Sequence, residues 1–333
     1  MRSRRLWPTV SGRTCERLPC GEGAKLVDTT PNRLRRNAQQ VAPRPQRQLL
    51  GGQGDGGNLS DQPYDRRRLS YASTFPNPIQ QRTIQAMELF TGKLPLLRLI
   101  RKFEAMGVPH GQAFWAQALG VMGIELTTPA EEIARIPREG PLVITANHPH
   151  GLVDGMVLAE LIGRVRTDYK ILTRSLLTGV GEIDMFMLPV PFAHDPDALQ
   201  QNLEMRKRAM DHLGDGGAIV LFPSGVVASS ETMFGPAIEA EWNPFTAKLI
   251  QRSGAQVLPI KFPGSNSRWY QIANRISPTI RQGLLLFEVR HALNKPQRPI
   301  VGEPLSPDEI KQWAGNPRGF MTWLRDRTLA LET

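Results

Sequence analysis

One segment of the sequence combines a buried strand, a polar loop and a helix without a break. Residues 141–146 are small or apolar and rich in β-branched side chains, which predicts a strand in the interior of a sheet. Residues 155–163 predict a helix, so the loop between the two lies at the carboxyl end of the strand. Open α/β sheets bind their ligands at this edge. We therefore expect the functional site of the chain in this loop.

The loop carries side chains suited to proton transfer, namely His148, His150 and Asp154. A carboxylate that accepts a hydrogen bond from one ring nitrogen fixes the tautomer of an imidazole and leaves the other nitrogen free to take a proton from a hydroxyl. Gly151 and Gly155 allow the tight turn that this contact needs. Two simpler interpretations stay open: Asp154 only caps the following helix, and the histidines are loop residues without a task.

The residues Asn147-His148-Pro149, followed by Asp154-Gly155, resemble the signature of the glycerolipid (lysophospholipid) acyltransferases. In that family a histidine and an aspartate separated by four residues form the catalytic dyad. Here five residues separate His148 from Asp154 and three separate His150 from Asp154, so the chain resembles a variant with an Asn-His-Pro-x-Gly-x-x-Asp-Gly motif. The resemblance implies that His148 is the base and Asp154 its partner, with Asn147, His150 and Gly151 as substrate-binding residues.

Two later segments resemble the same family, and the resemblance extends over residues 84–330. One strand ends in Phe222-Pro223-Ser224-Gly225, where the family has Phe-Pro-Glu-Gly. A later strand, residues 257–261, contains Pro259 and resembles the family's strand that carries Val-Pro. The resemblance implies that residues 222–225 and Pro259 bind substrate. Taken alone, residues 222–225 are equally typical of a strand-to-loop turn.

The chain departs from the family where the head group is held. Ser224 stands in place of the glutamate, and residues 226–228 are Val-Val-Ala where the family often has Thr-Arg-Ser. In the family those residues help to hold a glycerol-phosphate head group. A phosphate-free or bulkier lysolipid acceptor is therefore an alternative to a phosphate-bearing one.

Beyond the loop, apolar strands alternate with amphipathic helices. Strands are predicted near 169–173, 186–191, 218–222, 256–261 and 284–289, and helices near 198–213, 242–253 and 317–331. This order predicts an α/β fold, with a central, mostly parallel sheet flanked by helices, over residues 129–333. Residues 79–128 predict an amphipathic helix pair, and Pro95 kinks or divides its first helix. The pair either inserts shallowly into a membrane interface or packs on the sheet.

The positive charge is concentrated at the start of the chain. The net charge is +10, and residues 1–69 alone hold 14 Lys or Arg and 6 Asp or Glu. Residues 1–78 are rich in Arg, Pro, Gly and Gln, which predicts a disordered tail. The nearly neutral remainder argues against a nucleic-acid partner. The tail either attracts anionic lipid or is a solvated segment without a function.

The cysteine positions and the hydropathy limit the kinds of site and of membrane attachment that the chain can have. Both cysteines, Cys15 and Cys20, lie in the tail, which excludes a cysteine nucleophile or a cysteine-ligated metal from the rest of the chain. The sequence contains no apolar run of 18 or more residues, so it predicts no membrane-spanning helix. We expect a peripheral or monotopic protein on the cytoplasmic face of the inner membrane.

The resemblance implies an enzyme that moves a fatty acyl group from acyl-CoA or acyl carrier protein to a hydroxyl of a lysophospholipid or related lysolipid. It implies no metal and no cofactor other than this thioester co-substrate. The main alternative is a metal-dependent hydrolase with His148 and His150 as zinc ligands. Against it, only His194, beside Asp195, lies near another predicted strand end. A serine hydrolase built on Ser224 lacks the Gly-x-Ser-x-Gly elbow, and the third class is a membrane-binding protein without enzymatic activity.

Overall fold

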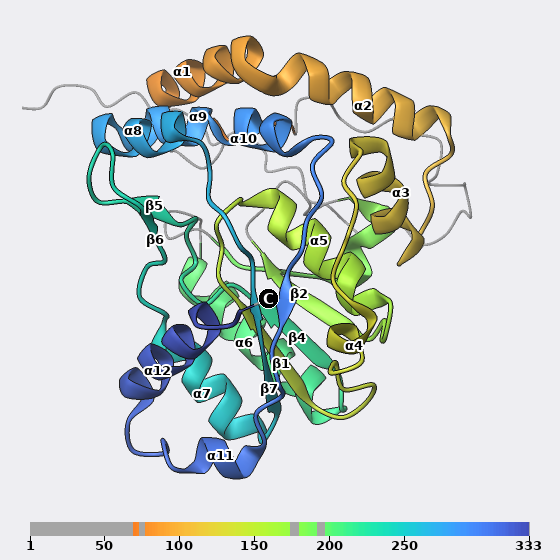
Figure 1. The fold of residues 1–333 in the computed structure, drawn as a ribbon, viewed down its shortest axis with the longest axis vertical. Helices are drawn as coiled ribbons and strands as arrows, with labels where there is room; N and C mark the ends of the chain where they lie inside the picture. The colour runs from red at the N-terminus through yellow and green to blue at the C-terminus, as the bar shows by residue number, and fades with distance from the viewer. Residues whose placement is uncertain (1–68, 73–76, 174–179, 192–196, 333) are drawn as a thin grey trace, which may run out of the picture. The chain divides into compact units, whose positions relative to one another are not determined.

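The fold is centred on a six-stranded sheet in the order β3-β2-β4-β1-β7-β8. The structure is a computed structural model that describes residues 69–72, 77–173, 180–191 and 197–332. All neighbouring strands run parallel except β8, which pairs antiparallel with β7 at the edge. The strands are β1 (Leu142–Ala146), β2 (Tyr169–Thr173), β3 (Met187–Pro189), β4 (Ala218–Leu221), β7 (Gln256–Lys261) and β8 (Ile300–Val301). The expected α/β architecture with a mostly parallel sheet is confirmed (Figure 1).

Both faces of the sheet are covered, which explains why its strands read as continuous apolar runs. In β1, Leu142, Ile144 and Ala146 point into one hydrophobic cluster, and Val143 points into the other. Helices α3 (Ala113–Met122) and α5 (Leu152–Gly163) pack on the first side, and α6 (Ala198–Gly214), α7 (Pro244–Ser253) and α12 (Pro317–Leu329) on the second. The sheet is therefore the middle of three layers, with β1 at its centre.

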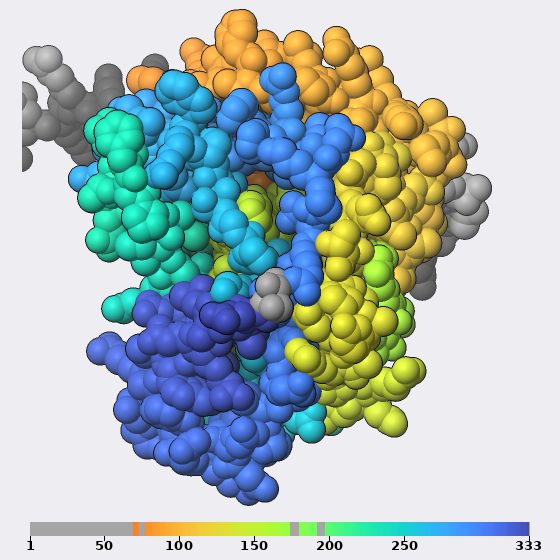
Figure 2. Space-filling view, viewed as in Figure 1, coloured from red at the N-terminus to blue at the C-terminus, as the bar shows by residue number. Residues whose placement is uncertain are grey.

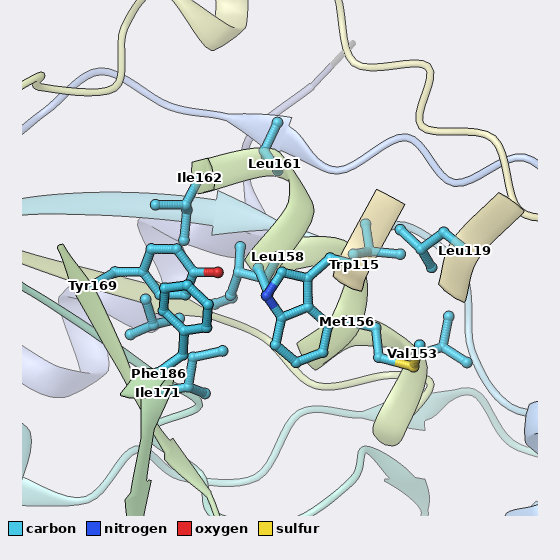
Figure 3. Packing of buried hydrophobic residues seen from close by; sticks show 14 of the residues in the cluster. Trp115, Leu119, Val153, Met156, Leu158, Leu161, Ile162, Tyr169, Ile171 and Phe186 are labelled. Atoms are coloured by element: carbon cyan, nitrogen blue, oxygen red, sulfur yellow. The ribbon is translucent and has the colours of Figure 1, made fainter. Parts of the chain in front are cut away.

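Aromatic side chains fix the contact between α3 and the sheet (Figure 3). Trp115 of α3 is fully buried, and Tyr169 of β2 stacks on Phe186 with ring centroids 4.6 Å apart. Phe186 belongs to the short 3-10 helix Gly181–Phe186. This packing anchors α5 next to α3 and so fixes the helix that follows the polar loop.

A further layer of helices, from residues 78–105 and 268–292, lies at the top of the view in Figures 1 and 2. The helices α1 (Pro78–Glu88) and α2 (Leu94–Ala105) are joined by a π-helical turn, Leu89–Lys93, and Pro95 lies in the first turn of α2. Helix α1 packs on α9 (Pro278–Gly283) and α10 (Leu285–Ala292), the turn packs on α10, and α2 packs on α3; α8 (Arg268–Ile276) packs on α9. Gly92 permits this approach, because a β-carbon there would lie 2.6 Å from the carbonyl oxygen of Leu286. In the part of the chain that the structure describes, no helix combines the length and apolarity needed to cross a bilayer.

The strand expected near 284–289 is wrong, because these residues form helix α10. A short apolar run fits a buried helix as well as a strand. The buried positions Leu285, Leu286, Val289 and Ala292 recur at helical spacing, which the apolar run alone did not distinguish. The sheet takes its edge strand from β8 instead, and no strand was predicted there.

The other expected elements are confirmed with shifted ends. The helix after the polar loop begins at Leu152, three residues before the expected start, so Asp154 lies inside it. Short elements without a clear sequence pattern complete the described residues: α4 (Ala130–Ile133), the hairpin β5 (Ser229–Ser230) and β6 (Ala237–Ile238), and α11 (Pro307–Lys311).

Candidate active site

Asp154 is the centre of the polar cluster at the carboxyl end of β1. It is the third residue of α5 and is fully buried. Its carboxylate accepts hydrogen bonds from the backbone N–H groups of His150 (2.8 Å) and Gly151 (3.1 Å). It also contacts both imidazoles, with Oδ2 3.0 Å from Nδ1 of His148 and Oδ1 2.9 Å from Nδ1 of His150. Asp154 therefore combines two tasks that the sequence left as alternatives: it caps the helix and contacts the histidines.

The surroundings of Asp154 hold it in the charged form. Burial by itself raises the pKa of this carboxyl, but the two histidines beside it and their hydrogen bonds outweigh burial, so the pKa of Asp154 lies below its ordinary value. An ionised carboxylate only accepts hydrogen bonds, so both Nδ1 atoms carry the proton. Each imidazole consequently turns its Nε2 atom away from Asp154.

Contacts of both the ring and the backbone hold His148 in place. Its ring stacks on Phe222 with centroids 4.0 Å apart. Its backbone N–H donates to Oε2 of Glu239 (3.1 Å), and its carbonyl accepts from the N–H of Ala228 (2.8 Å). The side chain of His148 keeps 18% of its surface exposed, whereas that of Asp154 keeps none. The ring is thus fixed in orientation and still partly exposed.

His150 lies on the other side of the carboxylate, beside the loop that follows β7. Burial lowers the pKa of His150, but the charge of Asp154 and its hydrogen bond outweigh this, and the pKa is raised above its ordinary value. A β-carbon on Gly264 would lie 3.1 Å from Nε2 of His150. The Gly264 backbone therefore adjoins the free edge of this imidazole.

Asn147 ties the loop to the neighbouring strand. Its Nδ2 donates to the carbonyl of Phe262 (2.9 Å), and its Oδ1 accepts from the N–H of the same residue (2.7 Å). The expected contact of Asn147 with substrate stays a prediction, and the bonds of its amide join the ends of β1 and β7. Gly151 adopts φ +76 at the start of α5, a region that favours glycine.

The structure places the remaining predicted residues at different depths. Phe222 is brought to the imidazoles, while Ser224 lies in an exposed turn with its hydroxyl donating to the carbonyl of Val226. Pro223 accepts from the N–H of Asn243, and Gly225 adopts φ +66 in the same turn. Pro259 lies inside β7, opposite Thr145 of β1. The roles assigned to these residues stay predictions.

Glu239 was missed by the sequence reasoning. It is buried, and its second oxygen accepts from the indole N–H of Trp242 (3.0 Å). Nothing in the sequence signals its contact with His148, because the two residues are 91 positions apart and Glu239 belongs to no recognisable pattern.

The structure also bears on the alternative of a metal site. Among the residues that the structure describes, no three or more His, Cys, Asp or Glu side chains are grouped so as to hold a metal ion. His194 and Asp195 lie outside the described residues, as do residues 1–68 with the two cysteines and the basic runs.

Comparison with known proteins identifies the class. A family model described as acyltransferase matches residues 109–332. Since this match covers more than half of the chain, the protein belongs to this acyltransferase family and is an acyltransferase. Among solved structures, the crystal structure of the 1-acyl-sn-glycerophosphate (LPA) acyltransferase PlsC from Thermotoga maritima is similar, with a TM-score of 0.41, 12% sequence identity, and coverage of 78% of this chain and 83% of that one. Comparison with curated proteins gives no match.

Proposed function

We propose that the protein transfers a fatty acyl group from a thioester, acyl-CoA or acyl carrier protein, to a hydroxyl of a lysophospholipid or related lysolipid. The observation that carries this proposal is the contact between Nδ1 of His148 and the buried carboxylate of Asp154 at 3.0 Å. It leaves Nε2 of this partly exposed ring as the proton acceptor. A neutral, oriented imidazole is the group that base-assisted attack by an alcohol requires.

The chemistry follows from these contacts. Nε2 of His148 takes the proton of the acceptor hydroxyl while its oxygen forms a bond to the thioester carbonyl carbon. The carbon–sulfur bond then breaks, and the proton returns to the departing thiolate, so an ester and a free thiol are the products. Asp154 stabilises the transient imidazolium, and Phe222 keeps the ring in place. No covalent enzyme intermediate is needed.

Replacing the base tests this assignment. His148→Gln removes the basic nitrogen, and we expect transfer to fall by about 10²- to 10⁴-fold. Free thiol release from acyl-CoA, measured with and without a lysolipid, reports the activity, and mass spectrometry identifies the acylated product. His291→Gln is the matched control, since His291 is exposed in the last turn of α10 and its ring stacks on Phe287. Near-full activity of His148→Gln would remove His148 from the mechanism.

We also propose that the protein binds the membrane surface through the helical segment α1–α2. Phe90 is 85% exposed and Leu94 is 51% exposed. Leu94, Arg98 and Arg101 follow at intervals of four and three residues, so they lie on one face of α2. Apolar side chains next to basic ones are suited to shallow insertion beside anionic head groups.

Vesicle sedimentation tests this surface. The double variant Phe90→Ser/Leu94→Ser should lose most of its binding to vesicles that contain anionic lipid. Leu199→Ser is the control, because Leu199 is equally exposed, at 77%, but lies on α6. Equal binding by both variants would refute membrane contact through Phe90 and Leu94.

A further inference from the structure

A pocket of about 450 Å³ adjoins the polar cluster and is lined by hydrogen-bond donors. Its walls come from the end of the β5–β6 hairpin, from the loop that follows β7, and from the first turns of α8. Gly264 forms part of the wall and is the residue whose backbone adjoins Nε2 of His150. A ligand in the pocket would therefore lie beside the proposed catalytic residues.

Two buried amide groups lining this pocket have no hydrogen-bond partner within the described part of the chain. Asn266 is 6% exposed and Gln271 is 2% exposed, and the NH₂ group of each is unpaired there. The orientation of Gln271 is fixed, because its Oε1 accepts from the backbone N–H of Ser230 at 2.6 Å. Its Nε2 must consequently be the free donor. Buried donors without an acceptor are costly, so their presence at a pocket indicates a ligand that accepts hydrogen bonds.

One cationic side chain and the start of a helix at this pocket favour an anion. Arg268 lies on its rim, and Nη1 of the guanidinium donates to the carbonyls of Phe234 and Gly235, which anchors the cation there. The positive end of the α8 dipole points the same way, since α8 begins at Arg268.

The buried acids nearby are already engaged. Both oxygens of Glu288 bind Ser267, and those of Glu239 bind His148 and Trp242. Their carboxylates thus face hydrogen-bond donors of the protein. By contrast, residues 222–228 at the exit of β4 include no cationic side chain.

We propose that Asn266, Gln271 and Arg268 form a binding site for a phosphate ester of one of the two substrates. The phosphate oxygens accept from both amides and from the guanidinium, with the dipole of α8 adding to the attraction. His150, whose Nε2 adjoins Gly264, adds a donor and a positive charge there when its ring carries both protons. This proposal rests on the acyl transfer proposed above, and it identifies where the negatively charged part of a substrate is held.

Kinetics with matched substrates tests the site and identifies the source of the phosphate. The variants are Gln271→Met, which removes the free donor at similar volume, and Arg268→Gln on the exposed rim, where folding is least affected. Gln251→Met and Arg275→Gln are controls: Gln251 bonds the carbonyl of Trp313 far along the chain, and Arg275 is exposed at the other end of α8. The acceptors are 1-oleoylglycerol 3-phosphate and 1-oleoylglycerol, and the donors are palmitoyl-CoA and palmitoyl-pantetheine.

If the acceptor supplies the phosphate, each site variant should raise KM for the phosphate-bearing acceptor by about 10-fold or more, a typical effect of losing a charge-assisted bond. KM for 1-oleoylglycerol and kcat should then stay near the wild-type values, as should every parameter of the controls. If the donor supplies it, the same increase appears in KM for palmitoyl-CoA and not for palmitoyl-pantetheine. Equal effects on substrates with and without phosphate, or no effect on any, would overturn the proposal.

A binding measurement separates this proposal from the proposed activity. Isothermal titration of the wild-type protein with sn-glycerol 3-phosphate should detect binding that the two site variants lose and the two control variants keep. That result supports the phosphate site even if no acyl transfer is found with any substrate pair. Binding that persists in both site variants would refute the site while leaving the acyltransferase mechanism in place.

Discussion

The substitution Asp154→Asn tests most directly how the polar cluster is held together. It keeps the shape of the side chain and removes its charge. Asp154 receives four N–H groups, from two backbone amides and two imidazoles. An asparagine Oδ1 accepts at most two hydrogen bonds, so at least two of the four donors lose their acceptor.

The magnitude follows from this count. A buried donor left without an acceptor costs about 1–3 kcal/mol, so two of them cost about 2–6 kcal/mol. Two effects reduce this value: the partly exposed imidazoles can turn to water, and the variant no longer buries a charge. We expect the free energy of unfolding to fall by about 2–3 kcal/mol, a large part of the stability of an ordinary domain.

The loss of stability does not account for the whole loss of activity that we expect. Nδ1 of His148 and both backbone N–H groups share Oδ2, so the asparagine oxygen takes this place and its NH₂ group faces His150. The uncharged oxygen no longer stabilises the imidazolium that His148 forms when it acts as the base. A loss of about 10²- to 10⁴-fold in kcat is expected, as for other oriented histidine bases. Thiol release measured at a temperature where both proteins are folded separates this loss from instability.

The pH dependence of stability supplies a second test. The pKa of Asp154 is lowered in the folded protein, so its stabilising effect is fully present above the ordinary value of 3.8 and is lost as the pH falls through the folded value. Urea unfolding of the two proteins should therefore differ most near pH 7 and converge in acid. Asp211→Asn is the control, because Asp211 is exposed and pairs only with Lys207 on the surface of α6. A loss below about 0.5 kcal/mol for Asp154→Asn, with retained activity, would refute the reasoning.

Three further results are expected. Asn147→Ala should lower the free energy of unfolding by about 2 kcal/mol in urea titrations, since both hydrogen bonds to Phe262 are lost. An unchanged urea midpoint would contradict a stabilising role of these two bonds. Glu239→Leu should lower kcat more than it raises KM for the thioester, because it frees the backbone of His148 without touching substrate; the reverse pattern would argue for a binding role. In NMR titrations, the pKa of His150 should lie above its ordinary value and drop in Asp154→Asn, where burial and the weaker effects of Glu288 and Lys295 remain. A rise would contradict the assigned cause.

The sequence predicted the central elements because their signals are local. The run from Leu142 to Ala146 is apolar at every position, as a strand covered on both faces must be, and the turn signals after it mark where the strand ends. His148 and Asp154 were recognised from their spacing in the same loop. Their contact follows from a chain that turns within a few residues, which leaves few arrangements open.

Residues distant in the sequence escaped prediction for the converse reason. Residues 284–289 are apolar enough for either a strand or a helix, and only packing against the π-helical turn and α1 decides for α10. Glu239 and Gly264 reach the histidines through loops whose course depends on the finished sheet. The same holds for Asn266 and Gln271, which carry no motif.

The amino-acid sequence alone determined the layered class of the fold, the strand that ends at the polar loop and the histidine–aspartate pair, since hydrophobic period and short loop geometry are encoded within a few residues. Only the tertiary structure decided that one carboxylate contacts two imidazoles, that Glu239 binds the backbone of His148, and that two unpaired amides line the same pocket as Gly264, the neighbour of His150. The contacts of Glu239 with His148 and of Asn147 with Phe262 join residues 91 and 115 positions apart. Their partners are selected by the packing of whole layers, and no local pattern records that selection.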